Sequence, residues 1–181
     1  IIIIPLAAWL TMILSPRRFA VTISAIFVIA SLLCSVAWNL ESMIVFRALQ
    51  GLAGGALIPF AFTLILTKLP PDQRPKGMAM FAITATFAPS IGPTIGGWLT
   101  ENFGWEYIFY INIVPGILMA TGLMYGLDKG NPRWELLRQG DYFGIVTMAI
   151  GLGCLQVFLE EGHREDWFES NLMVALAVIS F

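Results

Sequence analysis

Charged residues are scarce in this chain. Asp, Glu, Lys and Arg make up 12% of its 181 residues, against about 25% in soluble globular proteins, while hydrophobic residues make up 57%. So few charges cannot cover the surface of a soluble domain of this size, which favours a membrane protein. The net charge of −2 comes with no basic cluster interleaved with aromatic residues, so the composition gives no indication of nucleic-acid binding.

Side chains that carry enzyme chemistry are equally scarce. His163 is the only histidine, which leaves almost no support for histidine-based catalysis or a zinc site. The two cysteines, Cys34 and Cys154, lie inside apolar runs without metal-binding spacing, so we expect buried, reduced thiols. Because no nucleophile–base pair or phosphate-binding loop is present either, the sequence predicts neither an enzyme nor a cofactor.

Both ends of the chain are apolar. It begins with the run IIIIPLAAWL, without a methionine or a basic flank, and it ends inside another apolar run. A signal peptide needs a charged N-terminal region and a small-residue cleavage site, and neither pattern is present. These features favour an internal piece of a longer protein.

Continuous apolar segments divide the chain and predict its fold class. Segments 19–38, 42–66, 77–99, 107–127 and 142–159 are long enough to cross a hydrocarbon core, which is about 30 Å thick. Segments 1–14 and 172–181 resemble the end of one helix and the start of another. Because the apolar runs do not alternate, a closed β-barrel is excluded, and we expect an all-α, polytopic transmembrane helical bundle.

The loops between these segments alternate in charge. Loops 39–41, 100–106 and 160–171 hold eight acidic residues and one basic residue, Arg164. Loops 15–18, 67–76 and 128–140 hold eight of the ten basic residues, namely Arg17, Arg18, Lys68, Arg74, Lys76, Lys129, Arg133 and Arg138. The positive-inside rule predicts that the basic loops are cytoplasmic and the acidic loops external.

One basic residue lies inside an apolar segment. Arg47 is the single charge in segment 42–66, and a guanidinium at membrane depth costs at least about 2.5 kcal/mol. We therefore expect Arg47 to face a protein interior, a partner or a water-filled path, which favours a transport protein over a membrane anchor.

Glycines also recur at the small-xxx-small spacing of closely packed membrane helices. Spacing alone favours this packing interpretation, while a functional one adds that nearby prolines loosen helices that move. The glycines are Gly51 with Gly55, Gly92 with Gly96 and Gly97, and the looser pair Gly151 and Gly153; the prolines are Pro59, Pro89, Pro93 and Pro115.

In their order along the chain, these motifs resemble those of the major facilitator superfamily of transporters. Arg47, Gln50 and Gly51 resemble the RxxQG motif of its fourth helix. The sequence GPTIGG at 92–97 is similar to the GPxxGG core of the fifth-helix motif of proton-linked antiporters. Residues 104–116, which include Phe109, Asn112 and Pro115, are similar to the GWRWxFxINxPxG stretch that opens the sixth helix.

The C-terminal part resembles one branch of this superfamily. Asp141 to Gly144, with Gly162, Trp167 and Phe168, resembles the extra central helices of the fourteen-helix EmrB/QacA-type drug exporters. The resemblance covers essentially the whole chain. It implies that residues 1–127 form part of an N-terminal six-helix bundle, from the end of helix 2 to helix 6. Residues 128–140 would form a cytoplasmic linker, and 141–181 helix 7 and the start of helix 8.

One loop departs from the pattern. The loop between helices 2 and 3 usually reads GxLaDrxGrk. Here Ala8, Met12, Ile13 and Ser15 stand at its first glycine, acid, base and second glycine, and only Arg17 and Arg18 remain of the basic tail. The acid that would pair across the cytoplasmic gate is missing, so the usual charge network is not expected.

The resemblance implies proton-coupled export of drugs or other small lipophilic molecules by alternating access, in a multi-pass protein of the inner (plasma) membrane. Its partners would be a small-molecule substrate, protons, the lipid bilayer and, as a further candidate, a periplasmic adaptor protein, but not nucleic acid. Arg47, Gln50 and Gly51 would serve transport and proton coupling, Gly92, Pro93, Gly96 and Gly97 gating, and Arg17 and Arg18 the cytoplasmic loop.

Two alternatives to drug export stay open. One is a porter for another solute, such as a siderophore or an amino-acid-like molecule, and the other is a non-transporting receptor or scaffold on the same fold. No acidic residue lies deep within a predicted helix, and Asp141 at a helix start is expected to act as an N-cap. We therefore expect the proton-carrying carboxylate outside residues 1–181.

Overall fold

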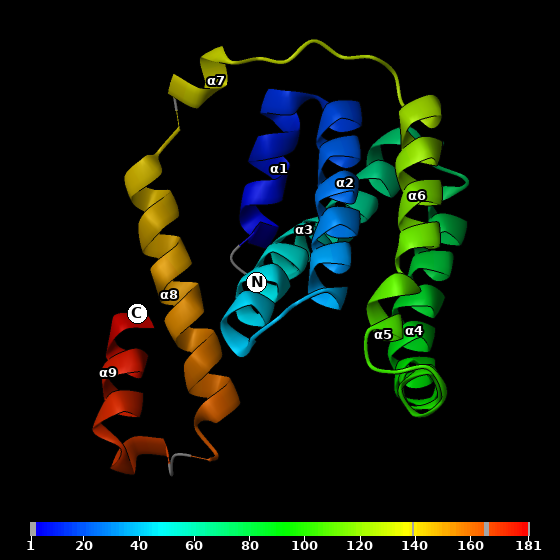
Figure 1. Cartoon of the computed structure of the whole chain (residues 1–181). Coiled ribbons are helices and arrows are strands. Elements are labelled where there is room, and N and C mark those ends of the chain that lie inside the picture. Colours follow the sequence, from blue (N-terminus) through cyan, green and yellow to red (C-terminus); the bar gives the residue numbers. More distant parts are fainter. Residues whose placement is uncertain (1–2, 139, 165–166, 181) are drawn as a thin grey trace.

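The computed structural model of the chain describes residues 3–138, 140–164 and 167–180. Expectations that concern Gln139, Glu165, Asp166 and the two ends of the chain fall outside these residues. The described residues form α1 (Ile3–Leu14), α2 (Pro16–Ser35), α3 (Leu40–Lys68), α4 (Arg74–Asn102), α5 (Tyr107–Tyr110), α6 (Ile113–Gly126), α7 (Glu135–Arg138), α8 (Tyr142–Glu161), a 3-10 turn η1 (Trp167–Glu169) and α9 (Asn171–Ser180). Figure 1 shows α1 to α6 as one bundle, with α8 and α9 beside it.

The helical bundle and its five predicted spans are confirmed. The helices long and apolar enough to cross a membrane among the described residues cover Pro16–Ser35, Leu40–Lys68, Arg74–Asn102, Tyr107–Gly126 and Tyr142–Glu161. Helices α2 and α3 begin before the predicted apolar runs, because a first-turn proline and a capping side chain set their starts. Pro16 occupies the first turn of α2, where its missing N–H is harmless. The Asn39 side chain accepts a hydrogen bond from the Ser42 backbone N–H at 2.7 Å and caps α3.

The confirmed span over 107–127 contains a break in its helical structure. It is divided into α5 and α6, with Ile111 and Asn112 between them. Pro115 accounts for the division, because it has no N–H for the Ile111 carbonyl and its ring crowds that carbonyl. The prolines Pro59, Pro89 and Pro93, by contrast, lie inside continuous helices.

The predicted helix cap at Asp141 and the two predicted buried thiols can be located in the structure. The carboxylate of Asp141 accepts the Gly144 backbone N–H at 2.8 Å, which confirms its role as the N-cap of α8. Both cysteines are free thiols. Cys34 is buried as predicted, whereas Cys154 on α8 is only partly buried among the described residues.

Helix α2 lies at the centre of the bundle. It packs most extensively against α3 and α6, and Figure 1 shows it between α1 and α6. Small side chains let these backbones approach closely, and the rings of Phe19 and Phe60 meet with centroids 5.5 Å apart. The core consists of Ala7, Phe19, Ala20, Ile23, Ala53, Ala56 and Phe60. Helix α4 contributes no buried residue to it.

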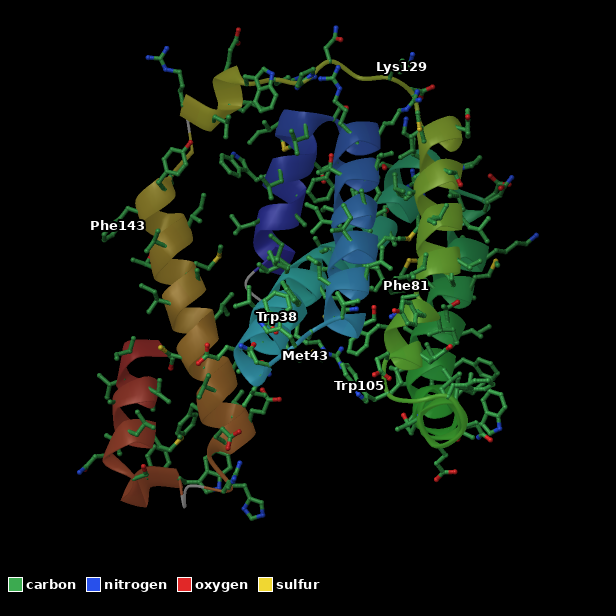
Figure 2. The ribbon with its side chains drawn as sticks, viewed as in Figure 1. Trp38, Met43, Phe81, Trp105, Lys129 and Phe143 are labelled. Carbon is green, nitrogen blue, oxygen red and sulfur yellow. The ribbon has the colours of Figure 1, made fainter. Side chains whose placement is uncertain are left out.

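Hydrogen bonds and an ion pair join the basic loops at one end of the bundle. Lys68 Nζ lies 3.2 Å from Asp128 Oδ2 and connects the end of α3 to the segment after α6. The Arg133 backbone N–H donates to the Ile13 carbonyl at 2.8 Å and connects the same segment to α1. In Figure 2, Lys129 lies at this end, while Trp38 and Trp105 lie toward the other. The predicted grouping of the three basic loops therefore agrees with the structure.

One glycine sets the approach of α6 to α2, and this gives a stability prediction. A Cβ at the buried Gly116 would overlap the Val28 side chain. We expect Gly116→Ile to cost about 1–3 kcal/mol of stability, because overpacking displaces neighbouring groups. The measurement is the thermal unfolding midpoint in detergent. Gly122→Ile on the same helix is the matched control, since a Cβ there meets no described atom within 4 Å. Equal midpoints for the two variants would refute the packing role.

Candidate functional site

Arg47 lies near one end of its helix. It is the eighth residue of α3, which places it about 10 Å along the axis from the first residue. In a helix of 29 residues this is the outer third. Its side chain is exposed among the described residues, and its neighbours therefore decide how it is held.

A chain of hydrogen bonds connects Arg47 to α2. Arg47 Nη1 donates to Gln50 Oε1 at 3.1 Å, and Gln50 Nε2 donates to Ser31 Oγ at 2.7 Å. The Ser31 hydroxyl in turn donates to the Phe27 carbonyl at 2.8 Å. Gln50 is 6% exposed and Ser31 is fully buried. Residues three apart share a helix face, so the RxxQ spacing lets one glutamine bind the arginine with its oxygen and α2 with its nitrogen.

An aromatic ring on a third helix, that of Phe109 on α5, contacts the Arg47 guanidinium. Arg47 Cζ lies 4.6 Å from the ring centroid of Phe109 on α5, within the range of a cation–π interaction. Phe109 is 4% exposed, and its ring makes an edge contact with Trp105 at 6.1 Å. Arg47 is thus held by α2, α3 and α5 together.

Ser31 and Phe109 are partners of the Arg47–Gln50 pair that the sequence motifs do not predict. Phe109 belongs to the sixth-helix stretch already noted, but nothing in that stretch points to α3. Ser31 belongs to none of the motifs, and the signal it offers is a hydroxyl inside the apolar run of α2. Both contacts arise from helix packing, which motif spacing does not contain.

The glycines of α3 differ in what surrounds them. A Cβ added at Gly51 would meet no described atom within 4 Å. A Cβ at Gly55 would lie 3.0 Å from the Ile3 side chain. Gly55 therefore lies in tight contact with α1, whereas Gly51 packs against no described neighbour.

The glycines of α4 are open among the described residues. A Cβ at Gly92, Gly96 or Gly97 would meet no described atom within 4 Å, and Pro93 beside them is exposed. The close packing that their spacing indicates is therefore not found within the described part of the chain. No hydrogen bond, ion pair or aromatic contact of the described residues joins this motif to Arg47.

The acidic residues of the described helices lie near helix ends, and none of them pairs with Arg47. Within the described helices, Glu41, Glu101, Glu135, Glu160 and Glu161 all lie within two residues of a helix end. The ion pairs of the described residues are Lys68 with Asp128 and Arg164 with Glu161. Arg47 thus has an amide and an aromatic partner here, and no carboxylate of the described residues pairs with it.

The chain matches the family model of the Major Facilitator Superfamily over residues 1–181. It is 41% identical over 179 residues to the colistin resistance protein EmrB of Acinetobacter baumannii, a match that covers 98% of this chain and 35% of that protein. It is 36% identical over 178 residues to the multidrug export protein EmrB of Haemophilus influenzae, covering 98% and 34%. It is 37% identical over 175 residues to the fatty acid resistance protein FarB of Neisseria gonorrhoeae, covering 97% and 34%.

The chain spans about a third of the length of these curated relatives. Its five apolar helices and the family match, which runs from its first residue to its last, lead to the same conclusion. The chain is a multi-pass membrane segment and belongs to the Major Facilitator Superfamily.

Proposed function

We propose that the protein exports drugs or other small lipophilic molecules in exchange for protons. The observation that carries the proposal is the RxxQG arginine, Arg47, held by Gln50, Ser31 and Phe109. The names of similar proteins, which refer to multidrug export and to colistin and fatty acid resistance, support the direction of transport and the substrate class.

Arg47 supplies the electrostatic part of the proposed mechanism. A cation favours the ionised form of a carboxylate that approaches it, and so favours proton release there. The carboxylate comes from a part of the protein outside residues 1–181, since the acids in the described helices lie at helix ends. Gln50 fixes the guanidinium, and Gly51 beside it keeps the helix surface open for the substrate path.

Helix α4 supplies the proposed gate. Its glycine face at Gly92, Gly96 and Gly97 is open among the described residues, and it packs against a helix from elsewhere in the protein. Pro93 removes one backbone hydrogen bond beside this face, which allows the helix to bend as the bundles alternate. Residues 1–127 then belong to the N-terminal bundle, 128–140 to a cytoplasmic linker, and 141–181 to the central helices of an inner-membrane protein that works with a periplasmic adaptor.

The proposal is tested with everted membrane vesicles that contain the full protein. We expect ethidium, a lipophilic cation, to accumulate in the vesicles when a proton gradient is imposed, and nigericin to abolish the accumulation. Uptake of a ferric siderophore or an amino acid instead of ethidium would support a porter for another solute. A receptor or scaffold would move none of these solutes.

The orientation of the chain gives a second test. In a variant with Cys34→Ser and Cys154→Ser, we expect a membrane-impermeant maleimide to label His163→Cys in right-side-out vesicles and to spare Gln73→Cys. The reason is that the basic loop 67–76 is predicted to be cytoplasmic and the acidic loop 160–171 external. Labelling of Gln73→Cys alone would reverse the orientation.

A further inference from the structure

A basic pocket lies at the end of the bundle where α1 meets α2. Its volume is about 540 Å³. The polar side chains of its lining come from α2 and its N-cap and from the segment after α6, and are those of Ser15, Arg17, Arg18, Thr22, Lys129 and Asn131; Gly130 also lines it. Figure 2 shows Lys129 at this end of the molecule.

The lining carries three cations and no acidic side chain. The ion pairs of the described residues involve neither Arg17, Arg18 nor Lys129. The nearby Asp128 is paired instead with Lys68, at 3.2 Å. The positive charge of the pocket is therefore uncompensated within the described residues, which attracts anions.

Ser15 adds an unsatisfied donor inside this pocket. It is the N-cap of α2 with a φ of 73°, and its side chain makes no cap hydrogen bond. The residue is 5% exposed, and its Oγ has no hydrogen-bond partner among the described residues. The first-turn N–H groups of Arg17 and Arg18 also lack an intrahelical partner, because they stand at the start of the helix.

Two contacts hold the halves of the pocket together. The Arg133 backbone N–H donates to the Ile13 carbonyl at 2.8 Å. A Cβ added at Gly130 would lie 2.9 Å from Ser15 Cβ, so a glycine is needed where the segment crosses the start of α2. The backbone of the segment after α6 is therefore held beside the start of α2, while the side chains of Arg18, Lys129 and Asn131 stay exposed around the pocket.

We propose that this pocket binds a phosphate group, carried either by an anionic phospholipid of the adjacent leaflet or by a soluble phosphate. A phosphate offers several acceptor oxygens, and a helix start with its free N–H groups suits them. The Ser15 hydroxyl and the cations of Arg17, Arg18 and Lys129 supply further donors. Basic pockets between helices at the cytoplasmic surface are suited to lipid headgroups.

The test uses the full protein, delipidated in an uncharged detergent. Binding of dioleoyl-phosphatidylglycerol is compared with that of dioleoyl-phosphatidylcholine by native mass spectrometry. Inorganic phosphate is compared with chloride at equal ionic strength by the shift of the thermal unfolding midpoint. Neither readout depends on transport, so the result is independent of the proposed function.

The pocket variant is Arg17→Gln with Lys129→Gln. Its matched control, Lys76→Gln with Arg138→Gln, removes the same charge at residues that do not line the pocket. We expect the pocket variant to bind phosphatidylglycerol about thirtyfold more weakly, and the control to stay within about twofold of the unmodified protein. Ser15→Gly should weaken binding about fivefold. It should not lower the unfolding midpoint, because glycine adopts the positive φ without strain.

Each outcome decides the proposal. Selective binding of phosphatidylglycerol that only the pocket variants lose supports a lipid phosphate. Stabilisation by inorganic phosphate without selective lipid binding supports a soluble one. The proposal is overturned if the unmodified protein distinguishes neither pair of probes, or if the pocket variant and the control lose binding equally. Ser15→Gly keeps the test valid if the double variant fails to fold.

Discussion

Replacing Arg47 with alanine should reduce proton-driven efflux to the rate of membranes without the protein, while the protein remains in the membrane at its normal level. Removal of a charge from a spanning segment makes insertion easier, so failed integration could not explain the loss. The substitution removes the cation that Gln50 Oε1 and the Phe109 ring hold in place. The measurement is the initial rate of ethidium efflux at equal amounts of membrane protein.

Arg47→Lys serves as the conservative variant and should restore only part of the rate. Lysine keeps a positive charge, but it lacks the planar fork that can bond Gln50 and cover Phe109 together. Ser31→Ala leaves Arg47 in place and removes the anchor of Gln50, so we expect an intermediate rate, about five- to tenfold below normal. Normal efflux by Arg47→Ala would mean that Arg47 is a tolerated packing residue.

Replacing Gly96 with leucine should stop turnover while substrate binding changes little. The glycine face of α4 is open among the described residues, and we propose that another helix approaches it during the transport cycle. A leucine would hold the two helices apart, because close approach of membrane helices depends on small residues. Efflux rate, equilibrium binding of ethidium and protein yield are measured on one preparation.

The three measurements distinguish gating from simple packing. If Gly96 only packs, Gly96→Leu loses folded protein and binding together with transport. Ala79→Leu, at an exposed position on the same helix outside the motif, controls for the added bulk and should transport normally. Unchanged efflux by Gly96→Leu would contradict both roles of the glycine.

The fold was largely predictable, because the cost of placing unpaired backbone groups in a bilayer leaves few possible structures. Long apolar runs can only span as helices, and the charge alternation of the loops agrees with the ends joined by Lys68–Asp128 and Arg133–Ile13. The helix boundaries were less predictable. They depend on Asn39 as a cap, on Pro16 in a first turn, and on Pro115, whose effect falls on a carbonyl four residues earlier.

The site was predictable only where its partners are close in sequence. Arg47 and Gln50 share a helix face through their spacing, and the structure joins them by a hydrogen bond. Ser31 and Phe109 come from other helices, so only tertiary packing reveals them. Ser15 was predictable in part. It stands where the family pattern has a glycine, and its φ of 73° explains that preference. That its hydroxyl lacks a hydrogen-bond partner could be seen only in the structure.

The central claim, exchange of a lipophilic molecule for protons, is tested most directly by following both in one vesicle. The full protein is reconstituted into proteoliposomes loaded with ethidium and a lumenal pH dye, and external ethidium is then removed by dilution. An antiporter takes up protons as ethidium leaves, so we expect the lumen to become more acidic in step with ethidium loss. Arg47→Ala should show neither change. Ethidium loss through the unmodified protein with no change in lumenal pH would contradict the claim.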